Sequence, residues 1–133
     1  MRWIRKVVLV LSCVVLVVVL TSCKDGPTSP AEYKVDGEWG GVLYEVFNIF
    51  LSLKEVKGYV YGIHGEGTIS VTGGSSVELQ VMGDREGTHV FLEIIPSGFQ
   101  QFFFDAKLED PNTLRGVVNG SGFINEKLVL KKR

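Results

Sequence analysis

Cys23 and the residues just before it form the segment of the chain whose residue types and spacing most clearly predict a chemical reaction. The protein has 133 residues and two cysteines. Cys23 ends the run Leu20-Thr21-Ser22-Cys23, which follows an apolar stretch over residues 7–20 and three basic residues within the first six. A basic head, an apolar middle and a small-residue end form the layout of a secretory signal. We therefore expect this segment to direct export.

The tetrapeptide also indicates how the signal is removed. Ordinary signal peptidase needs small residues at the last and third-last positions, and Leu20 is wrong for the latter. The four residues resemble the lipobox of bacterial lipoproteins: an aliphatic residue, two small residues and a cysteine. This resemblance implies cleavage after residues 1–22, a diacylglyceryl group on Cys23 and acylation of its amine. The alternative, an uncleaved membrane span, needs about 20 apolar residues, more than the run 7–20 supplies.

The location follows from this anchor. Several acyl chains on one cysteine hold a protein to a membrane lastingly, because each buried methylene contributes about 0.8 kcal/mol. Residues 23–35 contain two prolines and little to bury, so they predict a flexible tether behind the anchor. We expect a cell-envelope protein that faces the periplasm or the exterior. In proteobacterial lipoproteins Asp after the cysteine retains the protein in the inner membrane; Lys24 therefore favours the outer membrane in a diderm cell.

Charge and cysteine content limit the remaining function classes. Loss of residues 1–22 removes three basic residues, which leaves 11 Lys and Arg against 15 Asp and Glu and a net charge of −4. A mildly acidic domain is a poor binder of nucleic acid. Cys13 leaves with the signal and Cys23 carries lipid, so we expect no disulfide. The stability of the domain must then come from its apolar core.

The rest of the chain, residues 36–133, alternates apolar and polar side chains with turn residues about every ten positions. Such spacing predicts an all-β, antiparallel, up-and-down meander of about eight strands. We expect strands at 37–43, 46–54, 58–64, 76–83, 88–95, 99–108, 113–119 and 123–131, with a short extra one at 68–72. Glycine clusters such as 65–67 read as hairpin corners. Closure into a small β-barrel would remove exposed strand edges; a two-sheet β-sandwich is the alternative.

Gly37-Glu38-Trp39 opens the first predicted strand and resembles the Gly-x-Trp of lipocalins and avidins. The resemblance implies an eight-stranded barrel with Trp39 plugging one end. It carries no ligand-binding residues over to this chain. A barrel of this size is either filled by side chains or holds one small ligand. The predicted inward aromatic residues favour filling, unless they line one open end: Phe47, Tyr59, Tyr61, Phe102 and Phe104.

Catalytic and metal chemistry have few candidates. A hairpin pairing Leu92 with Phe102 would set His89 opposite Asp105 on the outer face, and surface pairs of this kind are usually structural. His64 and Glu66 share a face around a Gly-rich turn and could supply two metal ligands, but no third ligand is visible, which favours a solvated loop. We expect no catalytic residues, no cofactor and no metal, and thus no enzyme.

Two further features, an apolar stripe on the outer face and a carboxylate on the inward face, have both a structural and a functional interpretation. The same hairpin register sets Phe91 opposite Phe103, which with Val117 would form an outer apolar stripe. Such a stripe marks a partner surface, unless the loop 73–76 or the tether covers it. In the last strand, Ile124 and Glu126 fall on the inward parity; either a bulge turns Glu126 outward or it is a buried carboxylate.

These observations lead to one expected function and one alternative. The first is a non-enzymatic interaction or binding domain that uses the outer stripe or an open barrel end to contact a protein partner. The alternative is a carrier of a small apolar ligand inside the barrel. A cavity above about 300 Å³ between strand ends would favour the carrier. A packed interior beside a bare Phe91 and Phe103 would favour the interaction domain.

Overall fold

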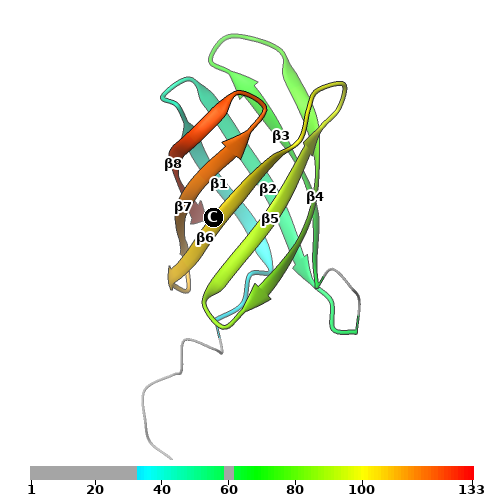
Figure 1. The fold of residues 1–133 in the computed structure, drawn as a ribbon, viewed down its shortest axis with the longest axis vertical. Coiled ribbons are helices and arrows are strands. Elements are labelled where there is room, and N and C mark those ends of the chain that lie inside the picture. Colours follow the sequence, from blue (N-terminus) through cyan, green and yellow to red (C-terminus); the bar gives the residue numbers. More distant parts are fainter. Residues whose placement is uncertain (1–32, 59–61) are drawn as a thin grey trace, which may run out of the picture.

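Eight antiparallel strands close into a single barrel in the computed structural model, which describes residues 33–58 and 62–133. Each strand pairs with the next along the chain, and β8 returns to β1 through Trp39 with Lys132 and Gly40 with Lys131 (Figure 1). The predicted all-β meander and its closure are therefore confirmed. The strands are β1 (Gly37–Leu43), β2 (Phe47–Glu55), β3 (Ile63–Val71), β4 (Ser76–Glu86), β5 (His89–Pro96), β6 (Phe102–Asp110), β7 (Thr113–Gly120) and β8 (Phe123–Lys132).

The interior of the barrel is an apolar core to which every strand contributes. Along β2, β5 and β6 alternate residues are buried and most of their neighbours are more exposed, as the pleat of a strand requires. Among the predicted inward aromatic residues, Phe102 and Phe104 are buried and Phe47 packs at the edge of the core. Tyr59 and Tyr61 lie outside the described residues.

The third strand was misplaced by sequence reasoning. One continuous strand, β3, covers Ile63–Val71, where a strand ending at 64 and a short strand at 68–72 were expected; residues 59–61 of the expected strand at 58–64 lie outside the described residues. Glycines 65 and 67 lie within it and do not form a hairpin corner. They pair with Leu53 and Leu51 of β2, where the two backbones approach closely. A Cβ on Gly67 would lie 1.8 Å from the Phe50 carbonyl oxygen, so only glycine fits there.

This close approach predicts that Gly67→Ala lowers the free energy of unfolding by about 2–3 kcal/mol, because the added methyl forces two backbones apart. Urea unfolding followed by circular dichroism measures the change. Gly62→Ala is the matched control, since its Cβ would meet nothing nearer than the Val56 carbonyl oxygen at 3.9 Å. Equal stability of the two variants would contradict the steric explanation.

The register between β5 and β6 also differs from the prediction. Leu92 pairs with Phe104, two residues further along than expected, because the connection comprises residues 97–101 and not the tight turn 96–98. A slip of two residues keeps every side chain on its predicted face. The inward and outward assignments on these strands therefore hold, while the cross-strand partners change.

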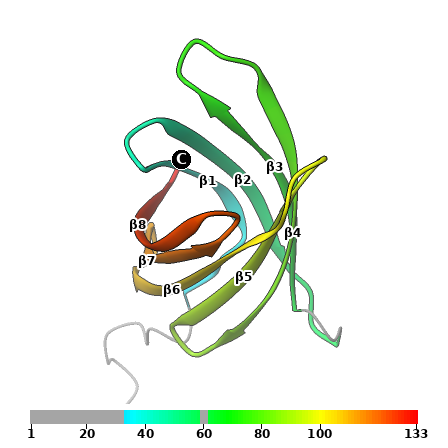
Figure 2. The same ribbon diagram turned by 45° about the horizontal axis from the view of Figure 1, so that its top comes forward.

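The two ends of the barrel differ in their connections (Figures 1 and 2). One end, here named the base, holds residues 33–36 and the turns 87–88 and 111–112. The other, named the mouth, holds the connections 44–46, 72–75, 97–101 and 121–122. The chain therefore joins the barrel at the base. The last residues of the predicted tether are packed there: Val35 is fully buried and Tyr33 contacts the core.

Residues 33–133 contain their own core and all eight strand pairings. β1 and β8 pair with each other through two residue pairs, so the sheet closes within this segment. A unit with a complete core and no open edge meets the physical criteria for independent folding. Residues 33–133 are referred to below as the barrel domain.

Candidate functional site

A cavity of about 310 Å³ opens at the mouth, between the strand ends. Its walls are almost entirely apolar, and the polar groups among them are serines. None of its lining residues carries a carboxylate, imidazole, amine or thiol. The cavity, named here the mouth pocket, is lined by Phe47, Ile69, Ser70, Val71, Ser75, Val77, Pro96, Phe99, Phe102, Ser121 and Phe123.

Three phenylalanines from different strands form the aromatic wall of the mouth pocket. The Phe123 ring lies 5.8 Å from the Phe47 ring and 5.8 Å from the Phe102 ring, measured between centroids. The interplanar angles are 88° and 72°. Edge-to-face packing of this kind is favourable for aromatic rings, so β2, β6 and β8 are held together at the mouth.

Phe123 reaches this position through an irregularity that sequence reasoning placed wrongly. Gly120 pairs with Phe123 and Val118 with Glu126, so between these pairs β8 has two residues where β7 has one, and one residue of β8 is extra. Asn125 adopts a left-handed backbone, with φ of 49°. As a result Ile124 is exposed and not inward, whereas Glu126 stays half-buried opposite an inward valine. The glycines of the turn 120–122 and Asn125 were the available signal in the sequence, because glycine and asparagine readily adopt the positive φ found at bulges.

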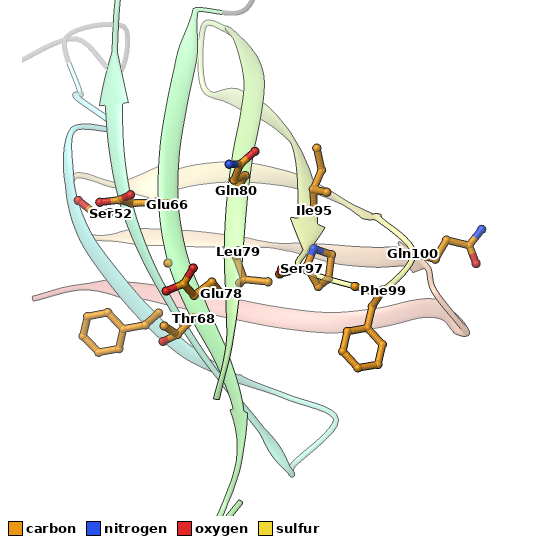
Figure 3. A pocket seen from close by; sticks show the side chains of 14 residues that line it. Ser52, Glu66, Thr68, Glu78, Leu79, Gln80, Ile95, Ser97, Phe99 and Gln100 are labelled. Atoms are coloured by element: carbon orange, nitrogen blue, oxygen red, sulfur yellow. The ribbon is translucent and has the colours of Figure 1, made fainter. Parts of the chain in front are cut away.

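A second, larger hollow lies on the outer surface of β2, β3, β4 and β5. It measures about 910 Å³ and is bordered on one side by the connection 97–101 (Figure 3). Its lining mixes carboxylates, amides and hydroxyls with a few apolar side chains, and Figure 3 shows Glu66, Glu78 and Gln80 along it. These groups come from solvent-facing positions of a curved sheet. The hollow therefore lacks the enclosed apolar surface of the mouth pocket.

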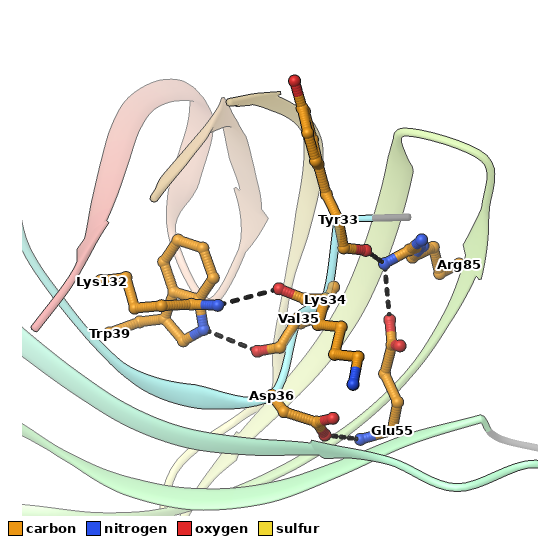
Figure 4. A network of polar contacts seen from close by, with 8 residues as sticks. All are labelled: Tyr33, Lys34, Val35, Asp36, Trp39, Glu55, Arg85 and Lys132. Atoms are coloured by element: carbon orange, nitrogen blue, oxygen red, sulfur yellow. Dashed lines mark hydrogen bonds and ion pairs between the residues drawn. The ribbon is translucent and has the colours of Figure 1, made fainter. Parts of the chain in front are cut away.

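The base is covered by side chains and hydrogen bonds (Figure 4). Trp39 is 0% exposed, and its indole Nε1 donates to the Val35 carbonyl oxygen at 2.8 Å. The Lys132 ammonium lies 5.0 Å from the centroid of the indole, and it donates to the Lys34 carbonyl oxygen at 2.9 Å. A cation over an indole face is electrostatically favourable. Trp39 is thus sandwiched between the core and a charged cover.

An ion pair extends this cover across the base. Arg85 lies 2.9 Å from the Glu55 carboxylate and also donates to the carbonyl oxygen of Tyr33. Asp36 accepts a hydrogen bond from the Glu55 backbone amide at 2.5 Å. These contacts fasten residues 33–36 to β2 and β4. The open pocket and the fastened end are therefore at opposite ends of the barrel.

The outer stripe is formed by diagonal neighbours and not by directly paired residues. Phe91 pairs with Asp105, and Glu93 pairs with Phe103. The Phe91 and Phe103 rings still stack, at 5.8 Å between centroids and 21° between planes. Phe91 is 39% exposed, while Phe103 and Val117 are half-buried. The connection 72–75 lies at the mouth, far from Phe91, and so does not cover it.

His89 and Asp105 meet in the same diagonal fashion. His89 pairs directly with Lys107, yet its Nε2 contacts an Asp105 carboxylate oxygen. Both side chains are more than half exposed, and surface ion pairs contribute at most about 1 kcal/mol to stability. The pair is placed as a surface contact on the side wall, distant from the mouth pocket.

The two possible metal ligands predicted from the sequence lie on one strand. His64 and Glu66 lie on the outer face of β3, opposite Lys54 and Ser52. Within residues 33–58 and 62–133 no three His, Cys, Asp or Glu side chains gather in a way that could hold a metal ion. Cys23 lies outside the described residues. In the described part of the chain, no helix has the length and apolar character to cross a membrane.

Comparison with known proteins provides no relative from which a function of the mouth pocket could be inferred. The chain matches no protein-family model, no curated protein and no solved structure.

Proposed function

We propose that this chain is a lipid-anchored, non-enzymatic binding protein of the cell envelope, and that its mouth pocket takes a small apolar ligand. The observation that carries the proposal is the 310 Å³ cavity between the strand ends, walled by phenylalanine rings. Concave, mostly apolar pockets of about 300–1,000 Å³ are the usual form of small-molecule sites. Lipocalin-like carriage through an open barrel end agrees with this geometry.

The lining of the pocket limits the class of ligand. A charged group inside it would lose hydration without gaining a partner, because the lining residues are apolar or hydroxyl-bearing. A neutral ring system or one end of an alkyl chain fits these walls and this volume. Ser70, Ser75 and Ser121 could hydrogen-bond a single polar group at the opening. The same lining supplies no acid–base or nucleophilic pair, which supports binding over catalysis.

Anchoring through Cys23 is the second part of the proposal and is supported by the sequence. The residues before Cys23 resemble a lipobox, and the chain joins the barrel at the base. A tether attached there leaves the mouth unobstructed. Lys24 favours the outer membrane if the cell has one. The domain would then meet its ligand in the periplasm or at the cell exterior.

Ligand binding can be measured with the barrel domain and an uncharged fluorescent probe, N-phenyl-1-naphthylamine. Val77→Trp places an indole inside the mouth pocket and is expected to weaken probe binding by about tenfold or more, since the ring occupies the space the ligand needs. Val129→Trp on the outer face of β8 is the matched control. Native mass spectrometry of the protein purified from cells then identifies any ligand it retains.

Two results would contradict a ligand site at the mouth. One is a wild-type barrel domain that binds no apolar probe. The other is equal weakening by Val77→Trp and Val129→Trp. Melting temperatures of both variants show whether either loss reflects unfolding.

The outer stripe supports a second candidate function, the docking of a protein partner. Its supporting observation is the exposed Phe91 ring stacked on Phe103. Phe91→Ser would then abolish capture of that partner by the full-length protein and leave probe binding unchanged. Val77→Trp would have the opposite pattern, so the two candidates are separable.

A further inference from the structure

Exposed apolar side chains gather around the mouth. Of the seven large hydrophobic residues that are exposed in the described part of the chain, six lie in or beside the mouth connections, and the seventh is Phe91. The six come from β1, β3, β8 and two of the loops. They are named here the mouth rim: Val42, Tyr44, Val46, Val71, Phe99 and Ile124.

Charge has the opposite distribution. The mouth connections 44–46, 72–75, 97–101 and 121–122 contain one charged residue, Glu45. The base carries charge in residues 33–38, 84–86, 107–110 and 131–133, with both signs represented. A monomeric domain in water gains solubility from charged loops. The loss of charge at one end, coinciding with the exposed apolar residues, marks that end as a contact surface.

The rim consists of separate projecting tips and not one flat patch. Tyr44, Phe99 and Ile124 are 62%, 66% and 78% exposed and belong to three different connections or strand ends. Phe99 and Val71 also line the mouth pocket, and Ile124 directly follows the lining residue Phe123. Isolated apolar tips around a hole bury little area against a rigid protein surface, whereas a fluid surface can close around each of them.

The β1–β2 hairpin gives up local stability to present one of these tips. Tyr44 and Glu45 both have left-handed backbones, with φ of 52° and 60°. That pattern is the type I′ turn, for which Asn-Gly is strongly preferred. Non-glycine residues with positive φ cost energy, persist where the surrounding structure holds them, and cluster at functional sites. The hairpin thus carries an aromatic ring at the first central position of the turn, where backbone fit alone would favour asparagine, aspartate or glycine.

We propose that the mouth rim inserts into the headgroup region of a bilayer of zwitterionic lipids, so that the mouth pocket opens against the acyl chains. Tyrosine and other aromatic residues are favoured at this interface, and apolar side chains there bury to a depth of about 5–10 Å. The rim has no basic residues to attract anionic headgroups. The inference rests on the proposed function, because a lipid surface is the reservoir from which a neutral apolar ligand would enter the pocket.

Vesicle flotation with the barrel domain, which lacks residue 23 and any lipid, tests this inference. We expect binding to phosphatidylcholine vesicles that changes less than about twofold between low and high salt, because apolar insertion is not screened. The double variant Phe99→Ser and Ile124→Ser should reduce the partition coefficient by about tenfold or more. Phe91→Ser, the same kind of change on the side wall, is the matched control and should leave it unchanged.

Each other outcome overturns the lipid contact in a recognisable way. No flotation with phosphatidylcholine, or flotation that requires phosphatidylglycerol and disappears in salt, would overturn it. Equal effects of the double variant and Phe91→Ser would do the same. Dimers in solution that the double variant abolishes, without flotation, would assign the rim to a second copy of this chain.

Val77→Trp separates the two proposals. With the pocket blocked and the rim intact, vesicle binding should persist while probe binding is lost. Probe binding without vesicle binding would leave the ligand site standing and remove the membrane contact. Vesicle binding by a domain that takes up no probe would instead remove the ligand site.

Discussion

Replacing Trp39 with alanine is expected to lower the free energy of unfolding of the barrel domain by about 3–5 kcal/mol, the range for removal of a buried large aromatic side chain. The indole is fully buried, and its N–H satisfies the Val35 carbonyl oxygen. Alanine would leave a cavity at the base and an unpaired buried oxygen. It would also leave the Lys132 ammonium without the ring beneath it.

The measurement is urea unfolding followed by far-ultraviolet circular dichroism. Fluorescence is unsuitable, since Trp39 is the single tryptophan of residues 33–133. Trp39→Phe keeps a ring but removes the N–H donor, and its stability should fall between those of wild type and Trp39→Ala. A Trp39→Ala domain within about 1 kcal/mol of wild type would show that this residue does not close the base.

The second large effect concerns the anchor. In the full chain expressed in a bacterium, Cys23→Ser should abolish palmitate incorporation and leave residues 1–22 attached, because serine provides no thiolate for transfer of the diacylglyceryl group. The protein should also lose the electrophoretic mobility and detergent-phase partition of the wild type. Intact-mass measurement reports cleavage and lipidation together.

Cys13→Ser is the matched control for the anchor. Cys13 lies within the apolar stretch over residues 7–20, so its replacement should leave lipidation, cleavage and partition unchanged. Loss of palmitate in both variants would point to a general export defect. Unchanged partition and mobility of Cys23→Ser would be incompatible with the lipobox interpretation.

The strands that alternation predicted are those in which side-chain burial sets the pattern. In β2, the positions Ile49, Leu51 and Leu53 are apolar because each faces the core, and their polar neighbours face water. Period-two alternation therefore reports the face of each residue without knowledge of its partner strand. β3 carries too few apolar side chains for this, since Gly65 and Gly67 take two of its inward positions. Gly65 and Gly67 resemble turn residues in the sequence, because glycine is required both where a turn needs conformational freedom and where two backbones approach closely.

Cross-strand partners were predicted less well than faces. The five-residue connection 97–101 shifted β6 by two positions, which replaced the expected Phe91–Phe103 and His89–Asp105 pairs with diagonal contacts. Loop length sets the register of a hairpin. The start of β6 was predicted too early, at residue 99, because Phe99 in the loop has the apolar character expected of a strand residue. Ile124 was likewise predicted to face inward, because the one extra residue of β8 is visible only in the pairing of β8 with β7.

The order of residues was sufficient to predict the antiparallel meander, because alternation and turn residues are local patterns, and closure followed from the need to cover the edge strands. The anchor at Cys23 stays a prediction that rests on the resemblance of residues 20–23 to a lipobox. The mouth pocket and the mouth rim depend on residues far apart in the chain, such as Phe47, Phe99 and Phe123. They share one end of the molecule because an up-and-down barrel carries alternate connections to the same end. The predicted lipidation of Cys23 therefore depends only on its neighbours in sequence, while the candidate binding site arose from closure of the barrel.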